Sequence, residues 1–335
     1  MLDGQPGNTI VISFEVSFSI AMASRKILIL GAGELGIAIT DALLTHVAYD
    51  AASTAVTVAI RHSTLASLDT DSSSRMDSLK AYRARGVAFS STDLVADSER
   101  CISDLFRQHT CVIHAGAMTL PEGTQLKVTR AALAAGVEEY VPWQWGVDYD
   151  IIGRQGGLSL FSEQCDVREL LRSQSRTKWF IVSCGVFMSF LFEDFWGVIV
   201  RDSESKIIGV RALGGWDHLI TATTVEDIAR CNAELVLVDI DKRDKAVYIA
   251  GDTMRYDEFA EMIERVVGHG VTKELWSTEE LSKKSKEEPG EKLFKYRLVF
   301  SEGRGLAWEK KGTFNGVKSI EMEGIEAYMR RLGMT

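Results

Sequence analysis

The first half of the chain alternates short β-branched segments with amphipathic segments of helical length, from about residue 26 to residue 141. Right-handed βαβ units produce this alternation, and they build a parallel sheet that helices cover. We therefore predict an α/β fold with a Rossmann-type, doubly wound parallel sheet. The predicted strands are residues 26–30, 55–60, 87–90, 110–114, 139–141 and 178–183.

Apolar residues with a helical repeat predict helices over residues 34–47, 162–173 and 256–267. Residues 67–78 are rich in serine and aspartate, which indicates an exposed loop that leads into a further helix. Residues 279–292 are highly charged. We interpret them as a solvated helix or loop and not as a binding segment.

The regular alternation is lost after Ser183, where aromatic residues gather between Phe187 and Trp196. Thr224 then begins another predicted helix as its N-cap, with Asp227 three residues later. This spacing is a variant of the capping box with Asp in place of Glu.

Composition and charge narrow the classes of partner. The 335 residues are 46% hydrophobic, which is enough for a large core, and the net charge of -9 disfavours nucleic acid and anionic membranes. Small-molecule partners are expected. The sequence is also compatible with a homodimer. The apolar stretch of residues 10–22 contains Glu15, so it is a poor signal peptide and too short to span a bilayer.

The five cysteines are far apart and form no Cys-x-x-Cys pair. Neither a zinc site nor a disulfide framework is predicted, and no other metal site is expected. A reducing, cytoplasmic location is the simplest interpretation.

A glycine-rich turn carries the strongest chemical signal. The turn consists of Gly31, Ala32, Gly33, Glu34, Leu35 and Gly36. It follows a predicted strand and opens a predicted helix, which is the context of a dinucleotide-binding turn. The first glycine permits the tight turn, the second allows close approach of a pyrophosphate, and the third allows strand and helix to pack. The phosphates would lie at the helix N-terminus.

The residues after the second strand favour NADPH or NADP+ over NADH or NAD+, which lack the 2'-phosphate. Arg61 lies where an NAD-specific protein carries an acid, and a cation suits a 2'-phosphate. His62 flanks this site, and Lys80 is a second candidate cation. Asp93 ends the third strand, either near the adenine or as the cap of a helix beginning near Asp97.

The fourth strand ends in His114, Ala115 and Gly116. The small residues leave room for a cofactor that crosses the carboxyl edge of the sheet, and we interpret His114 as packed and not as a catalyst. Three segments result. Residues 25–183 form the NADP-binding Rossmann domain, 184–335 a smaller, mainly substrate-binding α+β portion with some returning segments, and 1–24 an extension outside the core fold.

The segment Glu-Tyr-Val-Pro-Trp-Gln-Trp-Gly-Val-Asp at residues 139–148 resembles the Phe-Val-Pro-Ser-Glu-Phe-Gly segment of the isoflavone reductase and NmrA-like family. The glycine-rich turn, Arg61 and residues 223–228 and 303–308 extend the resemblance. It implies an atypical short-chain dehydrogenase fold of the type found in fungal secondary metabolism, with a cleft between the sheet and the C-terminal portion. The residues then expected at the cofactor are Gly31, Gly33, Glu34, Leu35, Gly36, Arg61, His62, Asp93, Ala115, Gly116 and Pro142.

The family's catalytic lysine has no counterpart in this chain. The resemblance places Gln164 at that position, and no Tyr-x-x-x-Lys pair replaces it, because Gln144 and Gly153 lie four residues after the two nearby tyrosines. A neutral amide does not donate a proton efficiently, so another acid serves or the chemistry needs none. Hydride addition to an iminium ion needs none. Asp148 is a candidate proton relay or partner for a substrate cation, as are Asp150, Glu193 and Asp194.

Several aromatic residues are candidates for a substrate pocket. Phe187 falls where the family has a phenylalanine near the nicotinamide. The other candidates are Trp143, Trp145, Phe190, Phe192, Phe195 and Trp196. Each aromatic residue taken singly is more often part of a core.

These features support an NADPH-dependent oxidoreductase of a bulky, aromatic, alkaloid-like secondary metabolite. A cyclase that uses the cofactor to create a reactive iminium or diene is an alternative. A non-catalytic regulator that senses NADP is a third function, although it needs no large apolar pocket.

Overall fold

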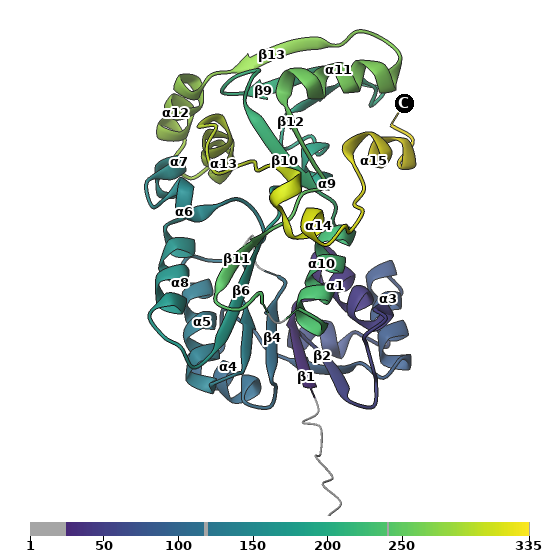
Figure 1. The fold of residues 1–335 in the computed structure, drawn as a ribbon, viewed down its shortest axis with the longest axis vertical. Coiled ribbons are helices and arrows are strands. Elements are labelled where there is room, and N and C mark those ends of the chain that lie inside the picture. Colours follow the sequence, from purple (N-terminus) through teal and green to yellow (C-terminus); the bar gives the residue numbers. More distant parts are fainter. Residues whose placement is uncertain (1–24, 117–119, 240, 335) are drawn as a thin grey trace, which may run out of the picture.

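The computed structural model describes residues 25–116, 120–239 and 241–334. The predicted extension over residues 1–24 lies outside them. A seven-stranded sheet has the order β11-β6-β5-β4-β1-β2-β3, and every neighbouring pair is parallel (Figure 1). Its strands are β1 (Arg25–Leu30), β2 (Thr54–Ile60), β3 (Ala88–Ser91), β4 (Cys111–His114), β5 (Glu139–Val141), β6 (Lys178–Ser183) and β11 (Lys245–Tyr248). All six predicted strands are present to within one residue at each end.

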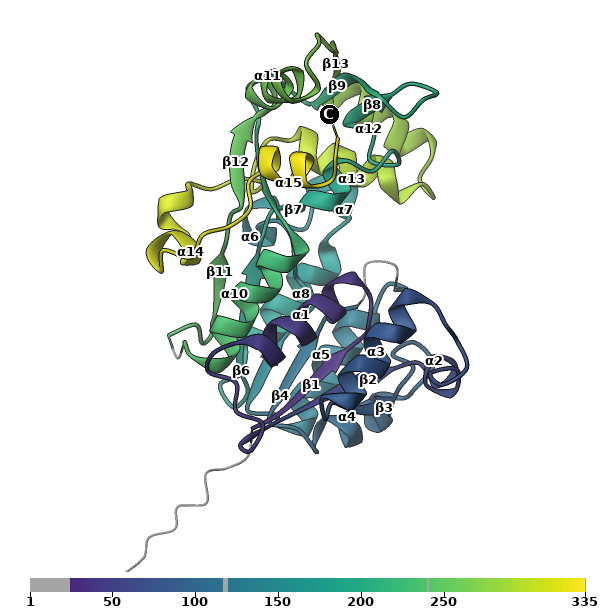
Figure 2. The same cartoon turned by 90° about the vertical axis from the view of Figure 1, so that its right-hand side faces the viewer.

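Alternating side chains of β1 explain why helices cover both faces of the sheet. Ile27 and Ile29 pack into one hydrophobic cluster, and Leu28 and Leu30 into another. The first cluster includes residues of α1 (Glu34–Thr45), α3 (Ser74–Ala84) and α10 (Val225–Leu237). The second includes residues of α4 (Glu99–Phe106), α5 (Thr124–Ala135) and α8 (Ser162–Arg172). Figure 2 shows α1 and α10 together on one face. The doubly wound arrangement is confirmed.

Two helices begin where the sequence predicted a loop or no helix, and the predicted N-cap at Thr224 is confirmed. The short helix α2 (His62–Ala66) was not predicted, and α3 begins inside the predicted loop because its Met76 and Leu79 reach the core. The capping box at Thr224 is only half formed. The Thr224 hydroxyl accepts the amide hydrogen of Asp227 over 3.2 Å, but the carboxylate of Asp227 binds Arg230 and the Glu323 amide instead.

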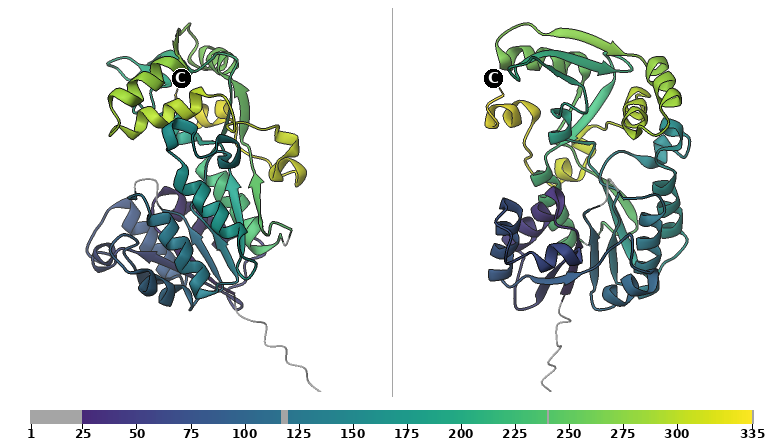
Figure 3. Two further views of the ribbon diagram at one scale, coloured as in Figure 1. Left: turned by 90° about the vertical axis from the view of Figure 1, so that its left-hand side faces the viewer. Right: turned by 180° about the vertical axis from the view of Figure 1, so that it is seen from behind.

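The C-terminal portion contains two small sheets and several helices. One sheet has the order β12-β10-β7 and the other β13-β9-β8. Their strands are β7 (Val186–Phe187), β8 (Ile199–Arg201), β9 (Ile207–Leu213), β10 (Leu219–Thr223), β12 (Asp252–Arg255) and β13 (Thr272–Trp276). The helices with clear packing roles are α11 (Tyr256–Val267), α12 (Thr278–Glu287), α13 (Lys292–Ser301) and α15 (Ile325–Arg331). Figure 3 shows α12 and α13 on one side of this portion and α15 on the other.

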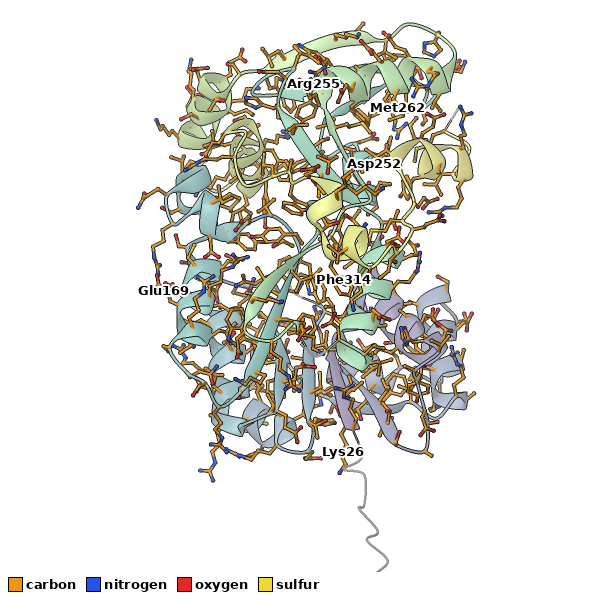
Figure 4. All side chains as sticks on the ribbon, in the orientation of Figure 1. Lys26, Glu169, Asp252, Arg255, Met262 and Phe314 are labelled. Carbon is orange, nitrogen blue, oxygen red and sulfur yellow. The ribbon has the colours of Figure 1, made fainter. Side chains whose placement is uncertain are left out.

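Short elements complete the fold: α6 (Tyr149–Ile152), α7 (Gly156–Ser159), α9 (Met188–Leu191), the 3-10 turn η1 (Lys310–Gly312) and α14 (Phe314–Val317). The C-terminal portion lies beyond the carboxyl edge of the large sheet. In Figure 4, Lys26 marks the amino end of β1, and Phe314, Asp252 and Met262 lie progressively farther from it. Within the described ranges, no helix combines the length and apolarity needed to cross a bilayer.

Candidate functional site

Two glycines of the turn between β1 and α1 are required by close packing. Gly31 has a φ of +99°, and a Cβ there would lie 3.1 Å from the Gly116 Cα. A Cβ on Gly36 would lie 2.2 Å from the carbonyl oxygen of Gly31, which is shorter than any tolerated contact. The turn therefore packs directly against the end of β4, and its shape depends on both glycines.

Gly33 has a different role, because a Cβ there would meet nothing within 4 Å. It is the N-cap residue of α1, and no side chain caps this helix. The first backbone N–H groups of an uncapped helix attract anions. The open space at Gly33 and the uncapped start of α1 fit the phosphates of a dinucleotide.

One arginine contacts this turn, and another follows the neighbouring strand β2. Arg61 is exposed at the end of β2, as the N-cap residue of α2. Arg75, in α3, donates a hydrogen bond from its Nε to the Ala32 carbonyl oxygen over 2.9 Å. Sequence reasoning missed Arg75, although it is one of a series of cations that follow β2. Lys80 instead donates to the Asp71 carbonyl oxygen over 2.8 Å and stabilises its own loop.

Asp93 forms hydrogen bonds within the turn that precedes α4. Its Oδ1 accepts the amide hydrogens of Val95 and Ala96 over 2.9 and 3.0 Å, and these bonds hold the pKa of Asp93 below its usual range. Asp93 therefore stabilises a turn and does not cap α4. Ser98 caps that helix by accepting the amide hydrogen of Cys101. The positive charges of Arg61 and His62 also lower the pKa, which places both near the Asp93 side chain.

The residues that follow β4 and β5 pack closely at the carboxyl edge of the sheet. Ala115 and Gly116 lie against the glycine-rich turn, and Pro142 is buried just after β5. His114 has no exposed surface, and burial lowers its pKa to about 4, so its ring is neutral at pH 7. The His114 carbonyl oxygen accepts a hydrogen bond from Trp145 Nε1 over 2.9 Å.

An apolar cavity of about 580 Å³ lies between the glycine-rich turn and the C-terminal portion. Glu34, Leu35 and Ala115 form part of its wall at the turn. Six of the seven aromatic residues proposed for a pocket line this one cavity: Trp143, Trp145, Phe187, Phe190, Phe195 and Trp196. The seventh, Phe192, does not, because it stacks on Tyr328 and packs against Phe259.

Residues far along the chain complete the wall. These are Gly146, Val147, Tyr149, Phe161, Gly185, Val186, Glu291, Lys292, Leu293, Tyr296 and Phe300. Burial raises the pKa of both Tyr149 and Tyr296, so their phenols stay neutral. Sequence reasoning missed this group, because the tertiary fold alone brings these residues, including those of α13, to the wall of the cavity.

Gln164 and Asp148, the proposed catalytic residues, are not part of the cavity wall. Gln164 is buried, and its backbone carbonyl accepts a hydrogen bond from Gln144 Nε2 over 2.8 Å. Asp148 accepts hydrogen bonds from Tyr248 Oη over 2.6 Å and from Arg168 over 3.3 Å.

Arg168 is the centre of this buried network. It is 1% exposed, and it also contacts Gln144 Oε1 over 2.7 Å and Asp150 over 2.6 Å. Arg172 and Arg168 lower the pKa of Asp150 to about 2. The network joins the end of β5 to α6, α8 and β11, which indicates a structural role for Asp148.

Of the carboxylates proposed for a substrate cation, Glu193 and Asp194 are exposed, and Asp194 pairs with Arg201 over 3.2 Å. Glu34 was assigned to the turn but also lines the cavity. Loss of hydration raises the pKa of Glu34, the Ser189 hydroxyl opposes this shift, and Glu226 and Glu193 add to it.

A second hollow of about 370 Å³ lies in the C-terminal portion. Its wall carries four carboxylates, and its one arginine, Arg265, pairs with Glu326 over 2.9 Å. It contains no residue of the glycine-rich turn, so the aromatic cavity is the candidate active site.

Comparison with known proteins identifies relatives that span nearly the whole chain. The NmrA-like family profile matches residues 23–328. An NmrA-like family domain-containing oxidoreductase of Gibberella moniliformis (strain M3125 / FGSC 7600) is 37% identical over 312 residues, which cover 93% of this chain and 99% of that protein.

Two solved structures illustrate the shared fold. An isoflavone reductase has a TM-score of 0.72 and 19% identity, covering 92% of this chain and 99% of its own. A leucoanthocyanidin reductase from Vitis vinifera, in a binary complex with NADPH, has a TM-score of 0.70 and 15% identity, covering 91% of this chain and 98% of its own. The predicted fold class is confirmed.

Proposed function

The chain belongs to the NmrA-like family, and on that premise we propose that it is an NADPH-dependent reductase of a bulky aromatic small molecule. One observation carries this proposal. The glycine-rich turn that fits a dinucleotide also forms one wall of an aromatic cavity of about 580 Å³. Such a volume is typical of pockets for multi-ring ligands. Cofactor and substrate would meet near Glu34, Leu35 and Ala115.

The cofactor side supports NADPH in particular. Arg61 follows β2 where an acid would disfavour a 2'-phosphate, and Arg75 lies beside the turn. Gly33 leaves space for the pyrophosphate, and the first N–H groups of α1 would bind it. Bound NADPH supplies a hydride. The relatives described above include a reductase in complex with NADPH, which adds support.

The substrate side supports a cationic nitrogen compound, such as an alkaloid-like secondary metabolite. Gln164 is a neutral amide outside the cavity wall, and Asp148 is held by Arg168 and Tyr248. Neither side chain is placed to give a proton to a substrate. An iminium carbon accepts a hydride without one, because a C–H bond forms while the C=N π pair becomes the nitrogen lone pair. We also propose a reducing compartment such as the cytoplasm, since all five cysteines are unpaired.

Purified protein incubated with NADPH and a panel of cyclic iminium ions and bulky enones would test the proposal. We expect NADPH oxidation with at least one bulky iminium substrate. Mass spectrometry should find the amine product, whose protonated ion is two mass units heavier than the iminium cation because it has gained one hydride and one proton. A Gly33→Ala variant is the matched control, because it should fold but bind NADPH poorly.

Other outcomes would replace the reductase with a different function. A rearranged, ring-closed product without net NADPH consumption would indicate the cyclase. NADPH binding without turnover of any compound, together with a specific protein partner in a pull-down, would indicate a sensing regulator.

A further inference from the structure

Glu34 differs from the other ionisable residues of the cavity wall. The first turn of α1 presents it beside Leu35, so it lies where the cofactor turn and the aromatic cavity meet. Glu291, another acid of the wall, caps α13 by accepting the amide hydrogen of Leu293 over 3.1 Å. Glu34 caps no helix, and the one hydrogen-bonding neighbour that lowers its pKa is the Ser189 hydroxyl, so most of the carboxylate is available to a ligand.

No basic residue of the described chain neutralises Glu34 by an ion pair within 4 Å. Arg331 lies in the same region, but it forms two bonds to Glu323 over 2.7 and 2.8 Å. Loss of hydration raises the pKa of Glu34, the Ser189 hydroxyl opposes this shift, and the neighbouring carboxylates Glu226 and Glu193 add to it. The turn end of the cavity therefore carries a carboxylate without an ion-pair partner beside two further acids, and a cation that enters would relieve their repulsion.

The aromatic residues of the wall favour the same kind of ligand, and the lysine of the wall, Lys292, is exposed at its α13 end. Trp143, Phe187 and Phe190 line the cavity with Glu34, and Phe187 and Phe190 have ring centroids 5.7 Å apart. An aromatic face stabilises a cation by roughly 0.5–2 kcal/mol. A neutral ring system of the same shape gains the apolar contacts. It gains neither the cation–π stabilisation nor the attraction to the carboxylate. An anion would be repelled at the Glu34 end.

We propose that Glu34 is the specificity-determining residue of this cavity, and that it selects flat aromatic or conjugated ligands with a positively charged nitrogen over neutral ligands of the same shape. This inference rests on the proposed function and deepens it. Glu34 would pair with the cation and would not transfer a proton.

Two nearly isosteric probes test the role of charge: 1-methylquinolinium, a cation, and 1-methylnaphthalene, a neutral molecule. Binding to the full-length protein loaded with NADP+ would be followed by tryptophan fluorescence, since Trp143 and Trp145 line the cavity. We expect the wild type to bind the cation at least about tenfold tighter than the neutral probe. Glu34→Gln should remove this preference and leave the affinity for 1-methylnaphthalene within about twofold.

Glu193→Gln is the matched control, because Glu193 is exposed and outside the cavity wall. It should change the affinity for the cation by less than about threefold, since the field of an exposed charge is screened by salt. Glu34→Asp retains the charge on a shorter side chain and should retain part of the preference. Thermal unfolding would verify that each variant is folded.

Equal preference for the cation in wild type and Glu34→Gln would overturn the role of Glu34, even if NADPH-dependent reduction is found. Failure of the wild type to bind NADPH in a direct titration would instead refute the proposed function. The two failures are thus observed in separate measurements.

Discussion

Arg75 Nε donates a hydrogen bond to the carbonyl oxygen of Ala32 over 2.9 Å. A helix that follows the second strand thereby contacts the turn that fits the cofactor phosphates. Arg75→Ala should weaken NADPH binding by about fivefold to tenfold, because it removes a charge-assisted hydrogen bond, of roughly 1.5–3 kcal/mol, that holds the turn in shape. Isothermal titration would measure the change. Arg83→Ala is the control on the same helix, since Arg83 pairs with Asp69.

Arg61 should determine the preference between the two nicotinamide cofactors. It is exposed at the end of β2, where no acid is present to bind the ribose hydroxyls. Arg61→Glu should weaken NADPH binding by at least tenfold and NADH binding by less than about threefold, because only NADPH carries the 2'-phosphate. Equal losses for both cofactors would refute this role of Arg61.

Gly33 and Gly36 should respond differently to alanine. A Cβ at Gly36 would lie 2.2 Å from a backbone oxygen, whereas at Gly33 it would meet nothing within 4 Å. Gly36→Ala should destabilise the protein by about 1–3 kcal/mol or more, as overpacking does. Gly33→Ala should leave the melting temperature nearly unchanged but reduce NADPH affinity. If both variants keep full affinity, the phosphates bind elsewhere.

Arg168 should contribute to stability and not to chemistry. Replacing it with Met leaves the carboxylate of Asp148, which is 4% exposed, buried without its cation. Removal of one partner of a buried ion pair costs about 3–5 kcal/mol. Denaturant unfolding of Arg168→Met should show a loss of this size, and a loss below about 1 kcal/mol would indicate that the network is not structurally important.

The acid sensitivity of the fold should depend partly on Asp150. Its pKa is lowered from 3.8 to about 2 by Arg172 and Arg168, so the folded state binds this proton more weakly than the unfolded state. The stabilisation is therefore complete above about pH 4 and is lost as the pH falls through 2. Asp150→Asn should be less stable at neutral pH and should lose less stability between pH 4 and 2. Asp77→Asn, at an exposed position of α3, should behave as the wild type does.

Much of the large sheet could be predicted from the sequence, because its strands are apolar runs separated by segments with a helical repeat. The short strand β11 (Lys245–Tyr248) was missed, since its four residues at the sheet edge contain no comparable apolar run. The glycine-rich turn was predictable as well, because Gly31 and Gly36 have a local steric cause and Gly33 leaves open space at the start of α1.

The chemistry of the cavity was harder to predict. A resemblance placed Gln164 at a catalytic position, but sequence does not determine which neighbouring side chain forms the wall, and Phe161 does so three residues earlier. Glu34 was assigned to the turn alone. Its electrostatic environment comes from Glu193 and Glu226, which are more than 150 residues away in the chain and are brought close only by the fold.

The two ends of the cavity come from separate parts of the chain. Leu35 and Ala115 belong to the Rossmann framework, whereas Leu293, Tyr296 and Phe300 belong to α13. Substitutions in α13 can reshape the space for a ligand without disturbing the turn that fits the cofactor. Directed evolution toward new ligands would therefore do best to diversify α13 first and keep the glycine-rich turn constant.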